Sequence, residues 1–332
     1  MMRGAFMSQH SLVPRYLVVL AAAWGCLGAA PPAVAQVLPK VVKIIVPFSP
    51  GGSNDLFARA IGQRLARKFN VSVIVDNRPG AGGAIGSEIV ARAPPDGSTL
   101  LLTSVSFATN SAVQKNLTYD PLKSFAPVAL LARGPMLLTV SNSTPYKTPA
   151  QYLEAARNSK NNINYGSAGI GSIGHMGGEM LNAMAGTQTT HVPYKGIANA
   201  VSDMIGGQLQ MMVTTAASVS GPLKAGYIRP IGVTSLKRSN FAPDLPPVAD
   251  VVPGFSIEVW WAMLAPAKTP KAIVEMLNAE IRAAGETPEL RELYARESTE
   301  PGQLTPAEFG AFLADEIVKW RRVAKDRNIT LD

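Results

Sequence analysis

The sequence predicts an α/β fold in two halves, each built on a mostly parallel sheet with helices on both faces. Short β-branched runs alternate with stretches of helical periodicity, and short glycine-rich loops join them. The alternation restarts at Thr148, where a threonine–proline pair marks a new helix start. The chain has 332 residues, of which 47% are apolar and 16% charged. This length and composition predict two domains with a large core and exclude a disordered, coiled-coil or collagen-like chain.

The alternation of strands and helices assigns most of the chain. Val41–Val46 is typical of a buried strand, and Ser53 or Asn54 can cap the helix that follows. Further strands are expected at residues 71–75, 99–103, 163–165, 190–192, 210–213, 228–233 and 259–264. Final helices are expected at residues 270–284, 288–296 and 306–327. Trp260 and Trp261 are adjacent on the last strand and face opposite sides of the sheet, so core packing is expected for both, with a cleft position as the alternative for one.

The first 35 residues have the features of a secretory signal. Arg3 and Arg15 supply its cationic region, and the apolar run at residues 16–30 is shorter than the about 20 residues that span a membrane. A small-x-small pattern ends at Ala35, so we predict cleavage after Ala35 and export of the remaining chain. The alternative is that Cys26, the one cysteine, becomes a lipid-modified first residue.

The formal net charge of +8 is compatible with nucleic acid, an anionic membrane or a small acidic ligand. Basic residues are scattered along the chain and form neither a stripe nor a platform interleaved with aromatic residues, which excludes nucleic acid. A single cysteine excludes a disulfide framework and a cysteine-based metal cluster. An anionic membrane and a small acidic ligand remain compatible with the charge.

The segment between the first strand and the first helix is a candidate anion site. Residues 49–55 have the sequence Ser-Pro-Gly-Gly-Ser-Asn-Asp. A strand–loop–helix unit directs free backbone N–H groups and the positive end of the helix dipole at one spot, where a carboxylate binds without Arg or Lys. The alternative is a tight turn in which Asp55 complements the helix dipole.

A second loop of this kind lies in the other half of the chain. Gly169, Gly171 and Gly174 satisfy the G-x-G-x-x-G pattern between a strand and a helix. A dinucleotide site also needs an acidic residue about 20 positions later, and the segment His-Val-Pro-Tyr-Lys that starts at His191 contains none. The sequence therefore predicts a second anion-binding helix start and no cofactor.

The sequence offers few residues for catalysis. Ser172 lies near a G-x-S-x-G pattern in which Ile170 replaces the first glycine, and His175 is one of only two histidines beyond the signal. Neither an H-E-x-x-H pattern nor a carboxylate cluster is present, so no metal site is predicted. We therefore expect no enzyme; the alternative is an envelope hydrolase that acts on a carboxylated substrate through Ser172 and His175.

Several segments together resemble one protein family. They are residues 45–55 (Ile-Val-Pro-Phe-Ser-Pro-Gly-Gly-Ser-Asn-Asp), 76–83 (Asp-Asn-Arg-Pro-Gly-Ala-Gly-Gly), 191–196 (His-Val-Pro-Tyr-Lys-Gly), 203–208 (Asp-Met-Ile-Gly-Gly-Gln), and Trp260 with 264–266 (Leu-Ala-Pro). This set is similar, in order and along nearly all of the chain beyond the signal, to the substrate-binding receptors of tripartite tricarboxylate transporters, also called the Bug family.

The resemblance implies a two-lobed periplasmic binding protein of type II, which closes like a Venus flytrap over one ligand. The implied division is a signal at residues 1–35, a discontinuous first lobe at 36–140 plus 254–332, and a second lobe at 141–253. The implied ligand is a small carboxylate, whether a dicarboxylate or tricarboxylate, an amino acid or an aromatic acid. The implied partners are the membrane permease subunits of such a transporter, or a sensor kinase, and we expect a monomer.

The resemblance places the ligand in the two loops described above and in the strand ends beside them. The expected ligand-binding residues are Phe48, Ser49, Gly52, Ser53, Asp55, Ser104, Ser106, Ser167, Ala168, Gly171, Ser172, Thr214 and Thr215. Thr214 and Thr215 stand where relatives often carry an Asp- or Asn-containing stretch. A carboxylate there would favour a ligand amine, so the two threonines favour an uncharged or purely anionic ligand over an amino acid.

Overall fold

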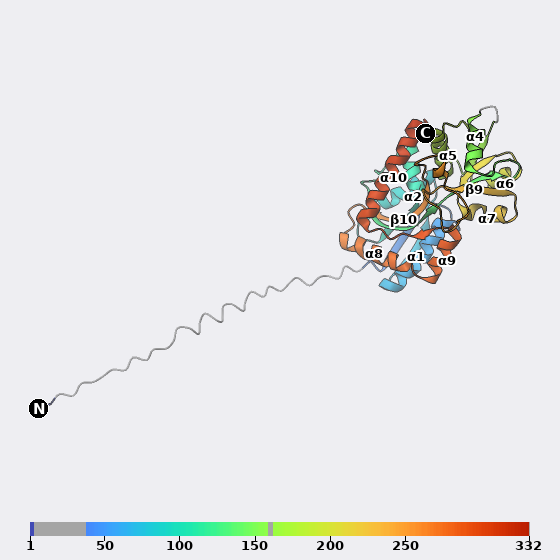
Figure 1. Cartoon of the computed structure of the whole chain (residues 1–332). Helices are drawn as coiled ribbons and strands as arrows, with labels where there is room; N and C mark the ends of the chain where they lie inside the picture. Colours follow the sequence, from blue (N-terminus) through green and yellow to red (C-terminus); the bar gives the residue numbers. More distant parts are fainter. Residues whose placement is uncertain (3–37, 159–161, 332) are drawn as a thin grey trace. The chain divides into compact units, whose positions relative to one another are not determined.

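The structure, a computed structural model, describes residues 1–2, 38–158 and 162–331 (Figure 1). The expected signal, its cleavage after Ala35 and the alternative at Cys26 lie outside these residues. Within the described ranges, no helix combines the length and the apolar character that crossing a membrane requires.

The first sheet has six strands in the order β11-β4-β10-β3-β1-β2. The strands are β1 Val41–Val46, β2 Ser72–Asn77, β3 Thr99–Ser104, β4 Phe125–Pro135, β10 Glu258–Pro266 and β11 Glu300–Pro301. β1 pairs in parallel with β2 and β3, whereas β10 runs antiparallel to β3 and β4. Nearly every residue of β3 and β10 is buried, because these central strands have neighbours on both edges and helices packed on their faces.

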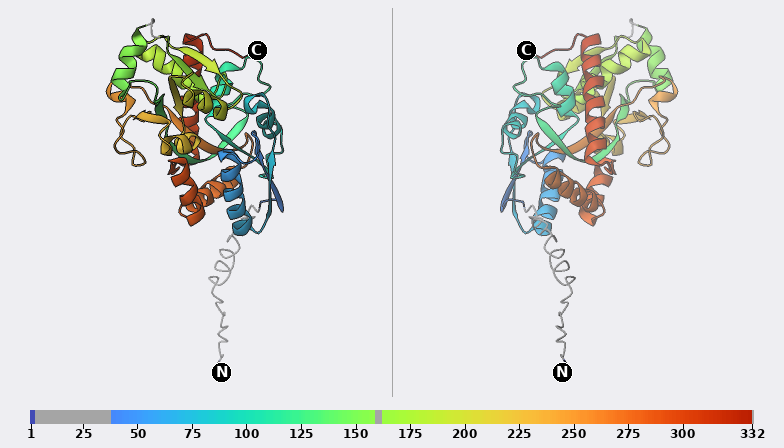
Figure 2. Two further views of the ribbon diagram at one scale, coloured as in Figure 1. Left: turned by 90° about the vertical axis from the view of Figure 1, so that its right-hand side faces the viewer. Right: turned by 90° about the vertical axis from the view of Figure 1, so that its left-hand side faces the viewer.

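Helices pack on this sheet from both ends of the chain. They are α1 Ser53–Phe69, α2 Ala84–Ala91, α3 Ser106–Val113, α8 Lys271–Ala284, α9 Pro288–Glu297 and α10 Pro306–Asp326, with a 3-10 turn η1 at Ala81–Gly83. α1 buries Phe57, Ile61 and Leu65 on one face, as the helical periodicity predicts. α10, red in Figure 2, packs against α3 and β4 of this half and also against α5 of the other half, described next.

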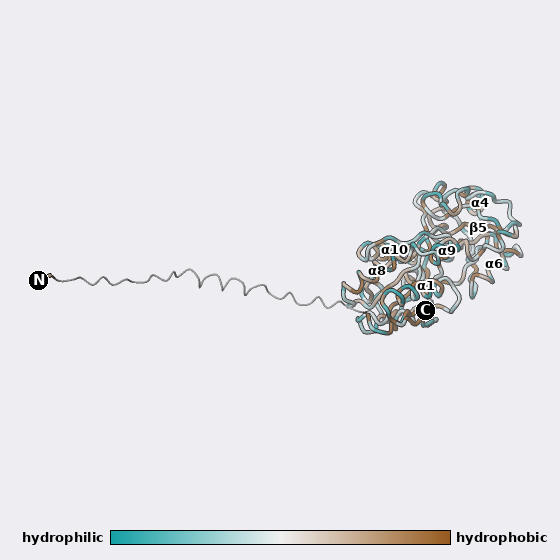
Figure 3. The backbone as a smooth tube through the Cα atoms, turned by 90° about the horizontal axis from the view of Figure 1, so that it is seen from below, coloured by the Kyte–Doolittle hydropathy of each residue, from teal (hydrophilic) through white to brown (hydrophobic). Residues whose placement is uncertain are grey.

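The second sheet has five strands in the order β7-β6-β8-β5-β9. The elements are β5 Leu137–Ser141, α4 Pro149–Arg157, β6 Asn164–Ser167, α5 Ile173–Ala185, β7 Thr190–Pro193, α6 Ile197–Ile205, β8 Met211–Thr214, α7 Ala216–Lys224, β9 Ile228–Val233 and the 3-10 turn η3 Val248–Asp250. β6, β7 and β8 are parallel, and β5 is antiparallel to β8 and β9. All five residues of β5 are buried, and the hydropathy colouring of Figure 3 shows polar, teal segments mainly on the surface helices.

The chain passes between the two sheets at two adjacent places. One crossing is Met136, the single residue between β4 and β5, and the other runs from β9 to β10. Thr234, which is fully buried, joins them: its Oγ1 accepts from the Met136 N–H at 2.8 Å and donates to Ile257 O at 2.6 Å. The backbone of Thr234 adds bonds to Met136 O and Ile257 N. A single side chain therefore connects the strands through which the two halves are linked.

The strand and helix predictions are confirmed to within two residues for β1 to β3, β6 to β10 and α8 to α10. The sequence does not predict α3, β4 or β5. Pro127, Gly134 and Pro135 weaken the strand signal of β4, and α3 is rich in Ser, Thr and Asn, which have low helix propensity. β4 and β5 pair antiparallel with β10 and β8, so the two sheets are mixed and not mostly parallel as the sequence predicts. The expected lobe boundary after residue 140 falls inside β5, and the division into lobes stays a prediction.

Trp260 and Trp261 are both buried, as expected for core residues. They contact opposite sides of the sheet: Trp261 packs on Phe57 of α1 with ring centroids 4.9 Å apart, and Trp260 Nε1 donates to Glu316 of α10 at 2.9 Å. Glu316 also accepts from Trp320 Nε1 at 3.2 Å. The charged pattern of the last helix predicts a solvated face, but Glu316 is 7% exposed because two indoles enclose it.

Candidate functional site

The predicted ligand residues come from four places of the same kind. In each, a strand ends and a helix begins: β1 to α1, β3 to α3, β6 to α5 and β8 to α7. β1 is parallel to β3, and β6 is parallel to β8, so within each sheet the two strand ends lie at the same edge. The first N–H groups of each helix have no intrahelical partner, so a side-chain cap or a ligand can bind them.

The loop between β1 and α1 is held by the carboxylate of Asp55. Oδ2 accepts from the Gly51 N–H at 3.0 Å, Arg59 binds both oxygens at 2.9 and 3.0 Å, and Asn77 Nδ2 donates to Oδ1 at 3.1 Å. Asn77 Nδ2 also contacts Phe48 O at 3.1 Å, which ties the loop to β2. Burial raises the pKa of Asp55, but the hydrogen bonds from Arg59, Gly51 and Asn77 outweigh burial and hold it below its usual value. The chain itself therefore engages both oxygens, and Asp55 shapes this loop.

The turn between β3 and α3 presents two serines. Ser104 is 6% exposed, and Ser106, the first residue of α3, is half-buried. Their hydroxyl oxygens lie 3.4 Å apart, and the Val105 N–H between them donates to Trp260 O at 3.0 Å. The turn is thus fixed to β10, and α3 begins without a side-chain cap.

The loop between β6 and α5 is held by a contact between Ser167 and His191 of the neighbouring strand β7. Ser167, which ends β6, is fully buried, and its Oγ lies 2.7 Å from His191 Nε2 of β7. Ser167 Oγ also contacts the N–H and the carbonyl oxygen of Gly169, each at 3.1 Å. Ala168, between them, is exposed. Ser167 therefore shapes the loop from inside the second half.

The start of α5 contains the two residues of the hydrolase alternative. Ser172 is the N-cap, and its Oγ accepts from the backbone N–H of His175 at 3.4 Å. The ring of His175 accepts at Nδ1 from the Gly171 N–H at 3.1 Å. The contact between Ser172 and His175 is thus a helix cap through the backbone, and the ring nitrogen serves the loop.

The turn between β8 and α7 contributes Thr214, which is 2% exposed, and Thr215, the N-cap of α7. Thr215 Oγ1 accepts from the Ser218 N–H at 3.4 Å and lies 2.7 Å from Ser218 Oγ. Thr215 and Ser218 therefore form one hydroxyl pair at the start of α7.

A cavity of about 580 Å³ lies between the start of α1 and α7. It is lined by Gly51, Gly52, Ser53, Leu56, Ala217, Ser218, Ser220, Lys224, Arg296 and Glu297. Gly52 and Ser53 are the predicted residues among them, whereas Ser167 and Thr214 are enclosed by the second half. The sequence does not predict two of the cationic side chains that line the cavity. They are Arg296, which pairs with Glu297 at 3.0 Å, and Lys224. A basic residue in the last turn of a helix is common, so nothing in the sequence marks Lys224 as a site residue.

The second loop lies against the first half in turn. A Cβ on Gly171 would lie 2.8 Å from a methyl of Val113 and 3.2 Å from Asn110 Oδ1, both on α3. Gly171 has φ +78°, a left-handed conformation that favours glycine. Each loop therefore faces a helix of the other half: Gly51, Gly52 and Ser53 face α7, and Gly171 faces α3.

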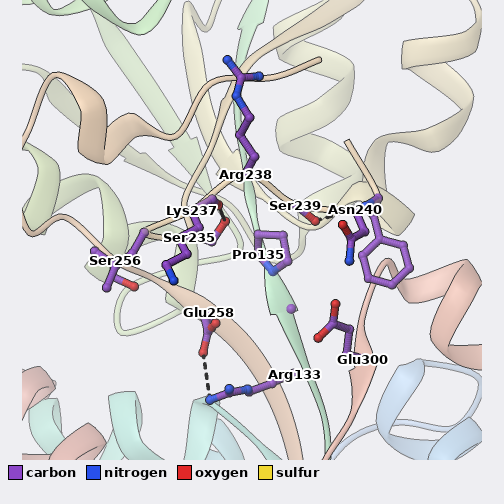
Figure 4. Close-up of a pocket in the computed structure, with 13 residues that line it drawn as sticks. Arg133, Pro135, Ser235, Lys237, Arg238, Ser239, Asn240, Ser256, Glu258 and Glu300 are labelled. Atoms are coloured by element: carbon purple, nitrogen blue, oxygen red, sulfur yellow. Dashed lines mark hydrogen bonds and ion pairs between the residues drawn. The ribbon is translucent and has the colours of Figure 1, made fainter. Parts of the chain in front are cut away.

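Figure 4 shows a different hollow, of about 490 Å³, beside the two chain crossings. Its charged lining residues are Arg133, Lys237, Arg238, Glu258 and Glu300, and Arg133 and Glu258 lie 3.9 Å apart. It contains none of the predicted ligand residues, whereas the cavity between α1 and α7 contains Gly52 and Ser53. We therefore place the candidate site at the cavity between α1 and α7.

The charges around the candidate site point to an anion. Arg296 and Glu297 both line the cavity and pair with each other, so the net positive charge comes from Lys224 and from the positive end of the α1 dipole, which opens into the cavity. In the described parts of the chain, no three His, Cys, Asp or Glu side chains gather as a metal site would require.

Comparison with known proteins shows which family of receptors the chain matches and which solved structures share its fold. Residues 57–329 match the family described as "Tripartite tricarboxylate transporter family receptor". A solved structure described as "R. palustris Rpa4515 with adipate" is 34% identical, with a TM-score of 0.77 over 87% of this chain and 98% of that one. The periplasmic binding protein BugD is 31% identical, with a TM-score of 0.73 over 87% and 98%. "MatC (Rpa3494) from Rhodopseudomonas palustris with bound malate" is 28% identical, with a TM-score of 0.73 over 85% and 98%.

Proposed function

The chain belongs to the tripartite tricarboxylate transporter receptor family, and we propose that it binds a small dicarboxylate between its two halves. Receptors of this family are periplasmic solute-binding proteins with a two-lobed α/β fold. The observation that supports the site is the cavity between the uncapped start of α1 and α7. Adipate and malate, named with two similar structures, are both dicarboxylates and support the ligand class.

One ligand carboxylate binds at the start of α1 in this proposal. The N–H groups of Gly52 and Ser53 have no partner within the helix, because α1 has no side-chain cap. Lys224 and the hydroxyl of Ser218 reach the same space from α7. Closure of the halves removes water, which strengthens each of these bonds by lowering the local dielectric constant. The family resemblance assigns the other ligand carboxylate to the loop at 167–172, and this assignment is part of the proposal.

The residues at the start of α7 favour a purely anionic ligand. Thr214 and Thr215 carry no charge, so this turn offers no counter-ion to a ligand amine. The cations of the cavity instead balance the ligand's negative charges. We therefore favour a dicarboxylate over an amino acid.

We also propose that the chain is exported with cleavage after Ala35, acts as a monomer and delivers its ligand to membrane permease subunits. A sensor kinase is the alternative receiver. We further infer that capture is not followed by catalysis. This inference is supported by the His175 ring, whose Nδ1 accepts from Gly171, and by Ser172, which caps α5.

The test combines a ligand panel with a backbone probe. Adipate and malate are titrated by calorimetry and compared with adipamide, which has the same shape as adipate but no charge. A ligand at about 100 times its Kd raises the free energy of unfolding by about 2.7 kcal/mol. Failure of every dicarboxylate to bind or to raise the melting temperature overturns the ligand class.

A pair of variants isolates the N–H of Ser53. Proline is tolerated at the first position of a helix and lacks an N–H, and the extended conformation of Gly52 permits a following proline. Ser53→Pro should therefore weaken dicarboxylate binding by at least about tenfold, since hydrogen bonds to charged groups contribute about 1.5–3 kcal/mol. Ser53→Ala keeps the N–H and is the matched control. Equal binding by the two variants would remove the start of α1 from the site.

A further inference from the structure

His175 occupies an unusual place for an imidazole, the third position of helix α5. The backbone N–H of His175 is bound by the N-cap Ser172, and the ring reaches back to accept the Gly171 N–H. A glutamate or glutamine normally makes such a reciprocal bond at a helix start. An imidazole nitrogen accepts a hydrogen bond only when it carries no proton, so this geometry requires a neutral ring with its proton on Nε2.

A second imidazole supports the other end of the same loop. The ring of His191 stacks on that of His175 with centroids 3.8 Å apart and an interplanar angle of 16°. His191 Nε2 contacts Ser167 Oγ, which in turn binds Gly169. The stacked pair thus holds both ends of residues 167–172, and a proton on either ring places a cation against the other ring.

The charged and titratable groups around the pair come from three elements. Glu179 of α5 lies one turn beyond His175, and its two oxygens bind Tyr165 of β6 and Arg327 beyond α10, each at 2.6 Å. Tyr165 also packs on His191 with centroids 5.0 Å apart. Arg327 pairs with Glu179, and this carboxylate raises the pKa of both imidazoles by less than burial lowers it. Burial lowers the pKa of His175, and burial with the neighbouring His175 lowers that of His191 to about 4.

We propose that His175 is a positioning residue of the ligand site: its neutral ring holds the Gly171 N–H and shapes residues 167–172 for the ligand, and its protonation in acid releases the loop and the ligand. This inference rests on the proposed binding function and adds its pH control. The positive end of the α5 dipole opposes the proton, and so does the facing His191. Once protonated, the His175 ring can no longer accept a hydrogen bond at Nδ1, and its charge repels the Gly171 N–H and a proton on His191. Gly171 then loses the bond that keeps it in a left-handed conformation against α3.

The first experiment needs no ligand. Nitrogen NMR of ¹⁵N-histidine-labelled protein reports the tautomer of each ring, and the expected signature of His175 near pH 7.5 is a proton on Nε2 with Nδ1 bare. Lowering the pH from about 7.5 should protonate His175 only below the ordinary range of an imidazole, together with a shift of the Gly171 amide signal. The inference is overturned if Nδ1 carries the proton at about pH 7.5, or if the Gly171 amide signal does not shift as His175 titrates, even where no ligand has been found.

The second experiment uses adipate as the probe. His175→Asn places an amide oxygen near the position of Nδ1, so it retains the acceptor without the titration; His175→Ala removes both. At about pH 7.5, His175→Asn should bind adipate within about twofold of wild type and His175→Ala about three- to tenfold more weakly, the range of one hydrogen bond. Across the pH range in which the NMR titration shows His175 taking up its proton, wild type should lose affinity more steeply than His175→Asn, and the ligand's own titration cancels in the comparison.

The outcomes separate the two proposals. Wild type that binds no dicarboxylate at any pH contradicts the proposed function, and the NMR titration then decides the role of His175 alone. Adipate binding with identical pH profiles in wild type and His175→Asn contradicts the pH control and leaves the binding function intact. Glu179→Gln is a further check: removing this charge lowers the pKa of His175 further, so the loss of affinity should move to lower pH.

Discussion

Replacement of Asp55 by alanine should loosen the first ligand loop and destabilise the fold. The carboxylate is 3% exposed and bonds to Gly51 N at 3.0 Å and Asn77 Nδ2 at 3.1 Å. Each of these two bonds contributes about 1 kcal/mol, so Asp55→Ala should lower the free energy of unfolding by about 2 kcal/mol. The bonds to Arg59 are left out of this figure, because that side chain is 51% exposed and surface ion pairs contribute little.

The assay is urea unfolding followed by tryptophan fluorescence, with adipate binding measured on the same samples. Asp96→Ala is the matched control: Asp96 also accepts a backbone N–H, from Ser98 at 2.8 Å, but in an exposed turn that does not line the cavity. Asp55→Ala should weaken adipate binding, whereas Asp96→Ala should not. If Asp55→Ala unfolds within about 0.5 kcal/mol of wild type and binds adipate equally well, Asp55 does not organise the loop.

Three further predictions concern the crossing, the cavity and pH. Thr234→Val keeps the shape of the side chain but leaves Met136 N and Ile257 O without their hydroxyl partner, so urea unfolding should show a loss of about 1–3 kcal/mol that Thr234→Ser avoids. Lys224→Gln should weaken adipate binding about two- to fivefold, an effect that about 0.5 M salt also produces in wild type and that a salt-independent loss would contradict. The pKa of His191 is lowered from 6.5 to about 4, so the unfolded chain takes up the proton first. The free energy of unfolding should therefore decrease as the pH is lowered from about 6.5 to about 4. A melting temperature of wild type that does not change across this range would refute the lowered pKa of His191.

The sequence predicts elements well where local pattern and tertiary environment agree. The β-branched run of β1 and the capped, amphipathic helix α10 are recognised within a residue of their ends. β4 is not predicted, because its prolines and Gly134 weaken the local signal. Its pairing with β10 on one side and β11 on the other overrides that local weakness. The mixed character of both sheets follows from such long-range pairings, which no local pattern encodes.

The same limit applies to the site. Glycine-rich loops after strands are visible in the sequence, and the positions of loops 49–55 and 167–172 follow from them. The part of α7 that faces the first loop cannot be recognised in the sequence, because Ser218 and Lys224 have residue types that are common on any surface helix. Asp55 is predicted as a ligand contact, yet its oxygens are engaged by Gly51, Arg59 and Asn77, a set of partners from three segments. Whether it also touches the ligand stays a prediction.

The two loops are organised by side chains with opposite requirements for a proton, and acid opposes both requirements. Asp55 must be ionised to hold the first loop, and its pKa is held below the ordinary value of 3.8. His175 must be neutral to hold the second loop, and its pKa, although lowered, descends from 6.5. As the pH falls, each loop should therefore lose the hydrogen bonds that its own titrating side chain supplies. In the proposed site, where the ligand binds at both loops, weakening of either loop should favour release without unfolding of the fold.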